Sequence, residues 1–332
     1  MRLLRYLMAL LLVSVAGGPR SSTLTPIVRE MVTIRSVPVT LRRDDRASTR
    51  VGALTLLAGW KLSSTSAQFG GWSALHIDGS RVTMIGDYGS VLRFRLTQFG
   101  RAVEARIDPL PAGCGSPADK RERDSESLAQ APDGWWIGYE SHHRVCRVSG
   151  DFTRALAVHT PSQMTDWRKS GGAEAMVRLN DGRVLVFAEA RPRNSAARPL
   201  LVFAGDPTTA ATPVVVRAYV APDGYSPTAA TQLPDGRILV LHRNFGAPAL
   251  FTTVLSVVDP TSLETGAPVQ GVAIARFVPP LLSDNYEGLA VTVEGKRPIV
   301  WMLSDDNFMS WQGSYLLKFA LDPQPVAAAK PR

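Results

Sequence analysis

Acidic residues recur at matching places in a repeated pattern, which predicts a cation site. Glu126, Glu174 and Glu287 each stand at the start of a short strand-like segment, in SESLA, GAEAM and NYEGLA. A second polar set follows the next strand of each repeat: Asp87, Glu140, Glu189, His242, Arg243, Asp305 and Asp306. Converging carboxylates repel one another and cannot all stay ionised without a cation. Oxygen-rich groups of this kind suit Ca²⁺, which accepts six to eight oxygen ligands.

Each polar residue has an expected role if these segments meet on one face. The expected metal ligands are Glu126, Glu174, Glu287, Asp305, Asp87 and Glu189. A metal among them would polarise a phosphoryl or ester oxygen and activate a water molecule. Nearby cationic or imidazole side chains would bind an anionic substrate, and these are Arg191, Arg243, His242 and His142. The structural alternative is that the acids only pair with arginines or accept bonds from backbone amides of neighbouring repeats.

The sequence lacks the motifs of several other common catalytic and binding sites. The sequence has no GxSxG elbow, HExxH helix, Walker loop or GxGxxG turn, which removes the common serine-hydrolase, zinc-protease and nucleotide-binding motifs. No basic stripe interleaved with aromatic residues supports nucleic-acid binding. Lys120, Arg121 and Arg123 stand among acids and are expected in a solvated loop. The tryptophans at 135, 136, 301 and 311 are expected to pack between sheets.

A hairpin repeated five times must position the polar residues. The repeats start at Ser73, Glu126, Glu174, Pro227 and Glu287, at spacings of 53, 48, 53 and 60 residues. Each contains a tight turn, at Asp78-Gly79, Asp133-Gly134, Asp181-Gly182, Asp235-Gly236 and Glu294-Gly295. Asp-Gly is a strong hairpin signal because glycine adopts positive φ without strain. Two further strand-like runs follow each hairpin, so the pattern predicts an all-β propeller of four-stranded antiparallel blades.

The ends of the repeat array suggest how the ring closes. The fifth repeat lacks an outer strand, and Val51–Leu62 supplies a suitable one. This pairing would remove two exposed sheet edges and make residues 51–322 one domain of five blades. Met31–Leu41 is a further strand candidate within the N-terminal segment 17–50, so a sixth blade stays open. An open array of β-sandwiches is the other architecture, although it does not explain the constant spacing. Residues 323–332 form a C-terminal tail.

The N-terminus predicts export. Residues 1–16 have Arg2 and Arg5 ahead of a short apolar run, with small residues at the expected cleavage point, as in a signal peptide. An uncleaved anchor is the alternative, but the run is much shorter than the roughly 20 residues of a membrane span. We therefore expect a periplasmic or secreted protein that has no membrane attachment once the signal peptide is removed. In an oxidising compartment, Cys114 and Cys146 would form a disulfide, while two unpaired thiols remain the alternative.

Five sequence blocks carry a family resemblance: FGGWSALHIDG, DSESLA, GGAEAM, SDNYEGLAV and WMLSDDNF. They resemble the bacterial phytase-like family, described as having the esterase-like activity of phytase, over about residues 50–321. The resemblance implies a propeller hydrolase. It also implies catalytic roles for the matching acids, which are Glu126, Glu174, Glu287, Asp305 and Asp306. Ser73 and Pro227 depart from an acid at the repeated position, so the resemblance leaves the number of metal sites open.

These patterns together predict an exported hydrolase. The formal net charge of +8 falls to +6 once Arg2 and Arg5 leave with the signal peptide, while the predicted functional face is acidic. We expect a monomer that uses Ca²⁺ to hydrolyse a small anionic or ester substrate, either a phosphoester or a carboxylic ester. Two alternatives remain at this stage: a sugar-lactone hydrolase, and a non-catalytic binding propeller with a structural ion.

Overall fold

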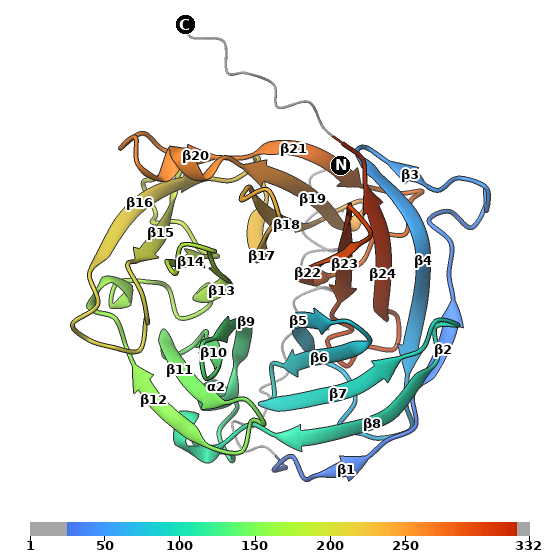
Figure 1. Cartoon of the computed structure of the whole chain (residues 1–332), viewed down its shortest axis with the longest axis horizontal. Coiled ribbons are helices and arrows are strands. Elements are labelled where there is room, and N and C mark those ends of the chain that lie inside the picture. The colour runs from blue at the N-terminus through green and yellow to red at the C-terminus, as the bar shows by residue number, and fades with distance from the viewer. Residues whose placement is uncertain (1–24, 324–332) are drawn as a thin grey trace, which may run out of the picture.

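Five sheets surround a central axis, as the repeated hairpins predict (Figure 1). The computed structural model describes residues 25–323. The predicted signal peptide at 1–16 and nearly all of the predicted tail lie outside the described residues. Within the described residues, the fold is an all-β propeller of five antiparallel blades, which confirms the predicted fold class. No helix of the described residues is long and apolar enough to cross a membrane.

The first two blades follow the chain from the axis outward. Blade 1 consists of β5 (Trp72–Asp78), β6 (Arg81–Gly86), β7 (Ser90–Leu96) and β8 (Ala102–Pro109), with β1 (Glu30–Met31) added at its outer edge. Blade 2 consists of β9 (Ser125–Ala131), β10 (Gly134–Tyr139), β11 (Arg144–Ser149) and β12 (Ala155–His159). Two short helices, η1 (Ala112–Cys114) and α2 (Lys120–Arg123), connect these blades.

The third and fourth blades repeat this order. Blade 3 consists of β13 (Ala173–Arg178), β14 (Val184–Ala188), β15 (Arg198–Phe203) and β16 (Val214–Val220), and it follows η2 (Ser162–Met164). Blade 4 consists of β17 (Ser226–Gln232), β18 (Ile238–Gly246), β19 (Leu250–Val258) and β21 (Val272–Phe277). Between the last two strands lie η3 (Pro260–Leu263) and β20 (Val269–Gln270), which pairs in parallel with the edge of blade 3.

Blade 5 combines the last three strands of the described chain with an N-terminal strand. Its inner strands are β22 (Tyr286–Glu294), β23 (Arg297–Ser304) and β24 (Ser314–Leu321), and its outer strand is β4 (Leu54–Ser63). Leu54 pairs opposite Leu321, so the predicted closure by an N-terminal strand is confirmed. Both β2 (Arg35–Pro38) and β3 (Arg50–Val51) pair with β4, while β1 joins blade 1. The segment Met31–Leu41 therefore extends existing sheets, and the described residues form no sixth blade.

The hydrophobic core lies between the blades. Each of five clusters of buried apolar residues joins two neighbouring blades, and the largest side chains in them include Trp72, Trp136 and Tyr286. Burying an aromatic side chain of this size contributes about 1.5–3 kcal/mol. Because both faces of every sheet are covered, the inner strands are held rigidly around the axis.

In most of the Asp-Gly turns, glycine has the predicted positive φ. Gly79 has a φ of +56° with open space around its Cβ position, so it serves backbone conformation and not packing. Gly134 differs because it lies in β10, where a Cβ would meet the carbonyl oxygen of Val148 at 2.0 Å. In the second repeat, glycine therefore permits close approach of two strands instead of providing positive φ.

The predicted disulfide between Cys114 and Cys146 is formed, with the two Cα atoms 5.7 Å apart. It ties η1 to β11, the third strand of blade 2. The disulfide therefore anchors the start of the connection that carries α2.

Candidate functional site

Each of the five inner strands has a bulge at the same position. The register against the second strand shifts by one residue there, which leaves Ser73, Glu126, Glu174, Thr228 and Glu287 unpaired. Bulges redirect the side chain of the extra residue. Glu126, Glu174 and Glu287 line one narrow cavity on the axis together with Thr228. The matching residue in blade 4 is thus Thr228 and not Pro227, which pairs with His242.

Two of these glutamates, Glu126 and Glu174, have no hydrogen-bond partner for their carboxylates within residues 25–323. Glu174 is 6% exposed, and among the described residues no hydrogen bond reaches the carboxylate of Glu174 or Glu126. Burial raises the pKa of Glu174 well above its ordinary value, and Glu189 and Glu140 raise it further. Burial likewise raises the pKa of Glu126, helped by Glu174 and Asp124. A buried carboxylate without a partner strongly disfavours its ionised form.

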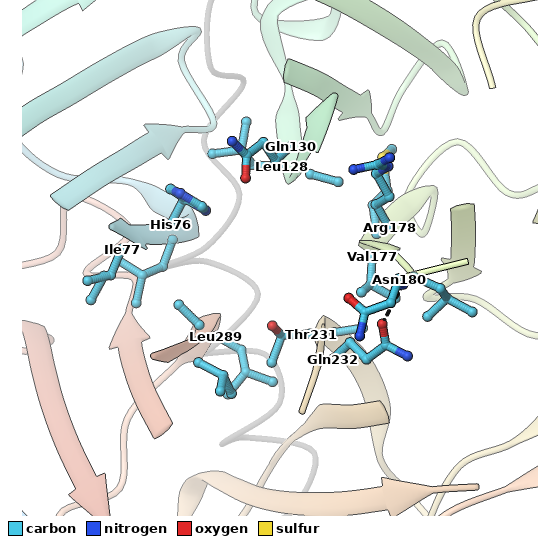
Figure 2. A pocket seen from close by; sticks show the side chains of 17 residues that line it. His76, Ile77, Leu128, Gln130, Val177, Arg178, Asn180, Thr231, Gln232 and Leu289 are labelled. Carbon is cyan, nitrogen blue, oxygen red and sulfur yellow. Dashed lines mark hydrogen bonds between the residues drawn. The ribbon is translucent and has the colours of Figure 1, made fainter. Parts of the chain in front are cut away.

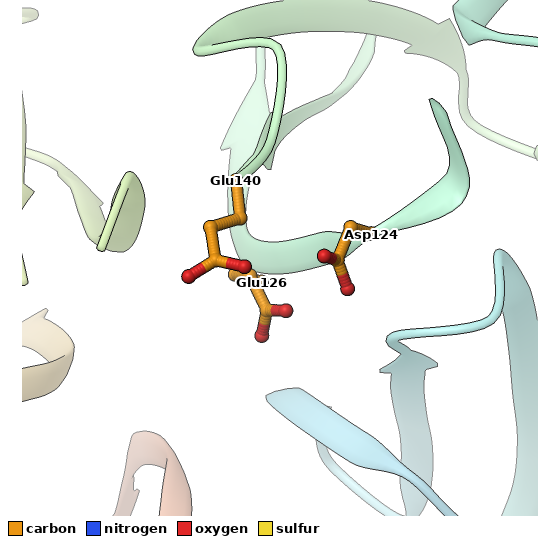
Figure 3. A group of neighbouring side chains, drawn as sticks. All are labelled: Asp124, Glu126 and Glu140. Carbon is orange, nitrogen blue, oxygen red and sulfur yellow. The ribbon is translucent and has the colours of Figure 1, made fainter. Parts of the chain in front are cut away.

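Glu140 links two groups of acids that are compact enough to hold an ion. Carboxylate oxygens of Asp124, Glu126 and Glu140 lie within 4.8 Å of one another, and Figure 3 shows the three groups from blade 2 close together. Glu140, Glu174 and Glu189 form a second group at the same mutual distance. Burial raises the pKa of Glu140 to about 8, and Asp124 contributes to the increase. These two overlapping groups have oxygen donors only, as Ca²⁺ prefers.

Arg243 is the cation on the blade 4 side of this group. Its guanidinium donates to Glu287, to Oε1 of Glu189 at 2.9 Å and to Oδ1 of Asn285 at 2.7 Å. Burial raises the pKa of Glu287 to about 7, although Arg243 and Asn285 oppose the shift. Arg243 is therefore held in one orientation by three partners from blades 3 and 5.

Lys120 is the cation on the opposite side, between blades 1 and 2. Its Nζ pairs with Asp124 and lies 3.2 Å from Oδ2 of Asp87. Burial lowers the pKa of Lys120, but Asp87, Asp124 and Glu126 outweigh this effect and raise it overall. The prediction of a solvated loop is wrong here. Arg123 is also buried, and it donates to the carbonyl oxygens of Gly89 and Pro111, which fixes α2 against blade 1.

Asp305 and Asp306 follow β23 but have different surroundings. Asp305 is buried near Glu287 and Asp87, and burial raises its pKa well above the ordinary value. Asp306 accepts hydrogen bonds from the amides of Gly71 and Phe308 and from the hydroxyl of Ser314. Asp305 thus lies among the buried carboxylates near the axis, whereas Asp306 organises the loop that leaves β23.

The predicted substrate-binding residues divide similarly. Of these four residues, only Arg243 pairs with carboxylates near the axis, those of Glu189 and Glu287. His242 is completely buried, where its ring contacts the hydroxyl of Tyr219 at 2.6 Å and the carbonyl of Val254 at 3.1 Å, and burial lowers its pKa to about 4. Arg191 is exposed on the loop after β14, without an ion pair to a described residue. His142 is also exposed, and it lines a separate cavity with Arg121, Ser141 and Lys169.

Three site residues were missed by sequence reasoning. Lys120 pairs with Asp124, and Asp124 lies beside Glu126 and Glu140. Asn285 donates to Glu287. Asp124 and Asn285 stand two residues before the bulged Glu126 and Glu287, so the same offset in two repeats was an available signal. No repeat pattern marks Lys120, because its position depends on the fold of the connection between blades 1 and 2.

The other end of the axis holds a separate cavity of about 330 Å³ (Figure 2). Polar side chains surround it, including His76, Gln130, Arg178 and Asn180. Leu75, Leu128, Met176, Ala230 and Leu289 line both this cavity and the narrow acidic one. An apolar belt therefore separates the two ends of the axis.

The charges at the acidic end do not balance. We call its eight carboxylates the axial acids: Asp87, Asp124, Glu126, Glu140, Glu174, Glu189, Glu287 and Asp305. Lys120 and Arg243 are the cations that pair with them among the described residues. Excess carboxylates in a buried cluster must bind protons or an added cation. The donor set therefore fits a divalent cation of the hard, oxygen-binding kind.

Solved structures match most of this chain at low sequence identity and with TM-scores below 0.5. Glutaminyl cyclase of Myxococcus xanthus is 13% identical, with a TM-score of 0.44 and coverage of 91% of this chain and 100% of that one. The allergen Mala s 1 of Malassezia sympodialis is 12% identical, with a TM-score of 0.45 and coverage of 89% and 96%. A hypothetical protein from Leishmania major is 15% identical, with a TM-score of 0.45 and coverage of 83% and 92%.

The sequence comparisons identify the family. Among curated proteins, none matches this chain. The family described as phytase-like, with the esterase-like activity of phytase, matches residues 67–308, a span that includes every axial acid. Since this match covers most of the sequence and all five inner strands, the chain belongs to the phytase-like family.

Proposed function

We propose that this protein is a calcium-assisted hydrolase of phosphoester or carboxylic ester bonds, acting at the axial acids. The observation that carries the proposal is Glu174, which is buried among other carboxylates without a hydrogen-bond partner among the described residues. A purely structural acid would be paired, as most buried polar groups are. Membership in the phytase-like family supports ester or phosphoester hydrolysis as the reaction class.

The ligands we propose for the cation are the two compact groups that share Glu140. One consists of Asp124, Glu126 and Glu140, and the other of Glu140, Glu174 and Glu189. When bound, a divalent cation would polarise a phosphoryl or acyl oxygen and lower the pKa of a coordinated water. Hydrolysis then joins the water oxygen to phosphorus or to the acyl carbon, and the leaving alcohol oxygen takes up a proton.

The chain's own side chains have three supporting tasks in this proposal. Arg243 is held by Glu189 and Glu287, so it presents a fixed positive charge to a substrate oxygen. Lys120 neutralises Asp87 and Asp124 on the other side of the opening. The apolar belt closes the axis below the acids and thereby limits access to one face of the disc.

Export to the periplasm or the medium is part of the proposal. It is supported by the signal-like residues 1–16 and by the disulfide, since disulfides persist in oxidising compartments. The test is the N-terminal sequence of the protein recovered from the periplasmic and medium fractions. A mature N-terminus close to residue 17 supports export, and an uncleaved cytoplasmic product contradicts it.

The experiment that tests the function uses the purified mature protein after chelation. Phytate, p-nitrophenyl phosphate, short acyl esters and lactones are assayed with and without Ca²⁺. We expect calcium-dependent turnover that Glu174→Gln abolishes. Asp181→Asn is the matched control because Asp181 is an acid at the opposite end, paired with Arg183. Turnover that is unaffected by chelation, or by Glu174→Gln, would contradict the proposal.

A non-catalytic propeller with a structural ion is the second candidate. It is favoured because the axial acids belong to different blades. An ion held by Glu140, Glu174 and Glu189 would bridge blades 2 and 3 and stabilise the ring. This candidate predicts that chelation lowers the melting temperature while no substrate is turned over. The lactone arm of the same assay tests the remaining enzymatic alternative.

A further inference from the structure

Three aromatic side chains form a partly exposed wall beside the acidic opening. Phe245 and Phe251 face each other across the β18–β19 hairpin with ring centroids 4.9 Å apart. Trp311 stacks on Phe251 with an interplanar angle of 18°. Phe245 and Trp311 are each 53% exposed. We call these three residues the aromatic wall. The sequence prediction that Trp311 packs between blades is wrong, because its ring projects from the loop after β23.

The wall lies close in the chain to residues that bond the axial acids. Phe245 lies two residues beyond Arg243 on the same strand. Ser283 donates to the carbonyl of Phe251, and two residues later Asn285 contacts both Arg243 and Glu287. Trp311 precedes Gln312, which contacts the carbonyl of Asp305. The wall therefore stands at the blade 4 and blade 5 side of the opening and not at a remote surface.

A second aromatic pair continues the same rim toward blade 1. Phe308 lies on the loop that also carries Trp311, and its ring meets Tyr88 edge to face at 4.9 Å. Tyr88 follows Asp87, and Nζ of Lys120 lies 4.9 Å from its ring centroid. The close approach depends on Gly71, where a Cβ would meet Asp87 at 2.3 Å and Phe308 at 2.6 Å. Aromatic rings thus border the axial acids from blade 4 to blade 1.

The chemistry of the wall favours an apolar ring over a sugar. Exposed aromatic side chains that cluster at one place mark binding surfaces. A carbohydrate also needs polar groups for its hydroxyls, but the polar neighbours of the wall are already engaged. Asn244 donates to the carbonyl of Gly224, and Ser283 to that of Phe251. Gln312 is buried against Asp284 and Asp305. Flat rings would gain stacking contacts here without hydrogen bonds.

We propose that the aromatic wall binds an aryl group of the substrate while the scissile phosphoester or ester lies at the axial acids. The proposal rests on the proposed function and narrows its substrate class to aryl or arylalkyl esters. It also makes phytate a poor substrate, because a polyanion without an aromatic group would gain nothing from the wall and would face an excess of carboxylates.

Binding and turnover are measured separately, so that the two proposals can fail independently. The binding probe is 1-naphthylmethylphosphonate, which resists hydrolysis, and methylphosphonate serves as the ringless reference, both titrated by calorimetry in the presence of Ca²⁺. We expect the naphthyl probe to bind at least about tenfold more tightly than the reference, an aromatic contribution of ordinary size. Trp311→Ala and Phe245→Ala should each remove most of this difference, while Trp311→Phe retains it.

Phe99→Ala is the matched control, since Phe99 is 80% exposed on the β7–β8 turn of blade 1. Melting temperatures of all variants verify folding. Equal binding of the two phosphonates, absence of naphthyl binding, or an equal loss in Phe99→Ala overturns the aryl proposal. If the naphthyl probe binds through Trp311 but no ester is hydrolysed, the wall is confirmed and the hydrolase proposal fails. If esters are hydrolysed without a preference for aryl groups, only the aryl proposal fails.

Discussion

Carboxylates at the two ends of the propeller axis behave in opposite ways. In the hairpin turns, Asp181 and Asp235 each bind the arginine two residues later, and those hydrogen bonds hold the pKa of each carboxyl below its usual range, against the opposing effect of burial. At the other end, burial raises the pKa of Glu174 and Glu126 well above the ordinary value. Acids therefore form a candidate site when they lack partners, and not because they are numerous.

The origin of the partners explains the contrast. A turn aspartate finds its arginine within the same hairpin, so the pair forms wherever the hairpin forms. The axial acids come from different blades and meet mainly other acids. The carboxylates of the hairpin turns are therefore neutralised by arginines nearby in the sequence. The acidic end has more carboxylates than Lys120 and Arg243 can neutralise, so it needs an added cation or protons.

The largest expected effect comes from removing the disulfide. Its loop spans 32 residues and includes Lys120 and Asp124, which serve the acidic end. Cys114→Ser with Cys146→Ser should lower the free energy of unfolding by about 3–4 kcal/mol, the value for loops of this length. Urea unfolding measures this change. If the double variant is as stable as the wild type, or if its calcium affinity is unchanged, the disulfide does not support the acidic end.

A smaller effect of unusual sign is expected for Glu174→Gln in the chelated protein. Removal of a buried carboxylate without a partner should raise the free energy of unfolding at pH 8 by about 2 kcal/mol, since unsatisfied charged groups are costly. The same substitution should abolish stabilisation by Ca²⁺, which follows ligand binding to the folded state. Urea unfolding with and without Ca²⁺ tests both effects. A loss of stability in chelator would show that Glu174 has a stabilising role without metal.

The pH dependence of the chelated protein should have a defined direction. Folding raises the pKa of Glu287 to about 7 and that of Glu140 to about 8, against an ordinary value of 4.5. At these two groups the folded state binds more protons than the unfolded state, so they lower stability as the pH rises. Buried His242, whose pKa is lowered to about 4, acts in the opposite direction below about pH 6.5, so the decline is expected from about pH 6.5 to 8. Ca²⁺ should flatten this decline. The turn aspartates, whose pKa values are lowered, lose stability only as the pH falls below about 4. Melting temperatures across this range provide the measurement, and a rise from about pH 6.5 to 8 in chelator would contradict the prediction.

The smallest effect is expected at the hairpin turns. Asp235→Asn removes an exposed pair with Arg237 and should lower the free energy of unfolding by less than about 1 kcal/mol, as surface ion pairs contribute little. Calcium affinity should stay unchanged. Thermal unfolding together with calcium titration provides the check, and a change in calcium affinity would show that the two ends of the axis are coupled.

The sequence predicted the fold well because hairpins are local. Asp-Gly turns, alternating strands and constant spacing belong to short segments, so five blades could be inferred, together with the closing strand Val51–Leu62. The bulged glutamates were also identified from their repeated position. Thr228 was missed because a bulge shifts the register by one residue, which no spacing reveals.

Other misses follow from the alternation of side chains along the chain. His242 and Arg243 are neighbours on β18, so one must face the sheet packing when the other faces the opening. His242 was predicted to bind substrate, but it is buried against Tyr219. Asp305 and Asp306 are also neighbours with different surroundings, but they lie in the loop after β23, where the amides of Gly71 and Phe308 bind Asp306. The position of Lys120 depends on the path of the irregular connection between blades 1 and 2. Arg123 and the disulfide fix this path, and no sequence pattern encodes it.

The acidic end can assemble only when β4 has closed the ring, because its residues come from several blades. Leu54 must find Leu321 across nearly the full described chain, a pairing of very high sequence separation that is slow to form. Glu287 of blade 5 reaches Arg243 and the acids of the other blades only in the assembled ring. Cation binding would therefore be absent from partly folded chains, and calcium affinity would report that the last blade has closed.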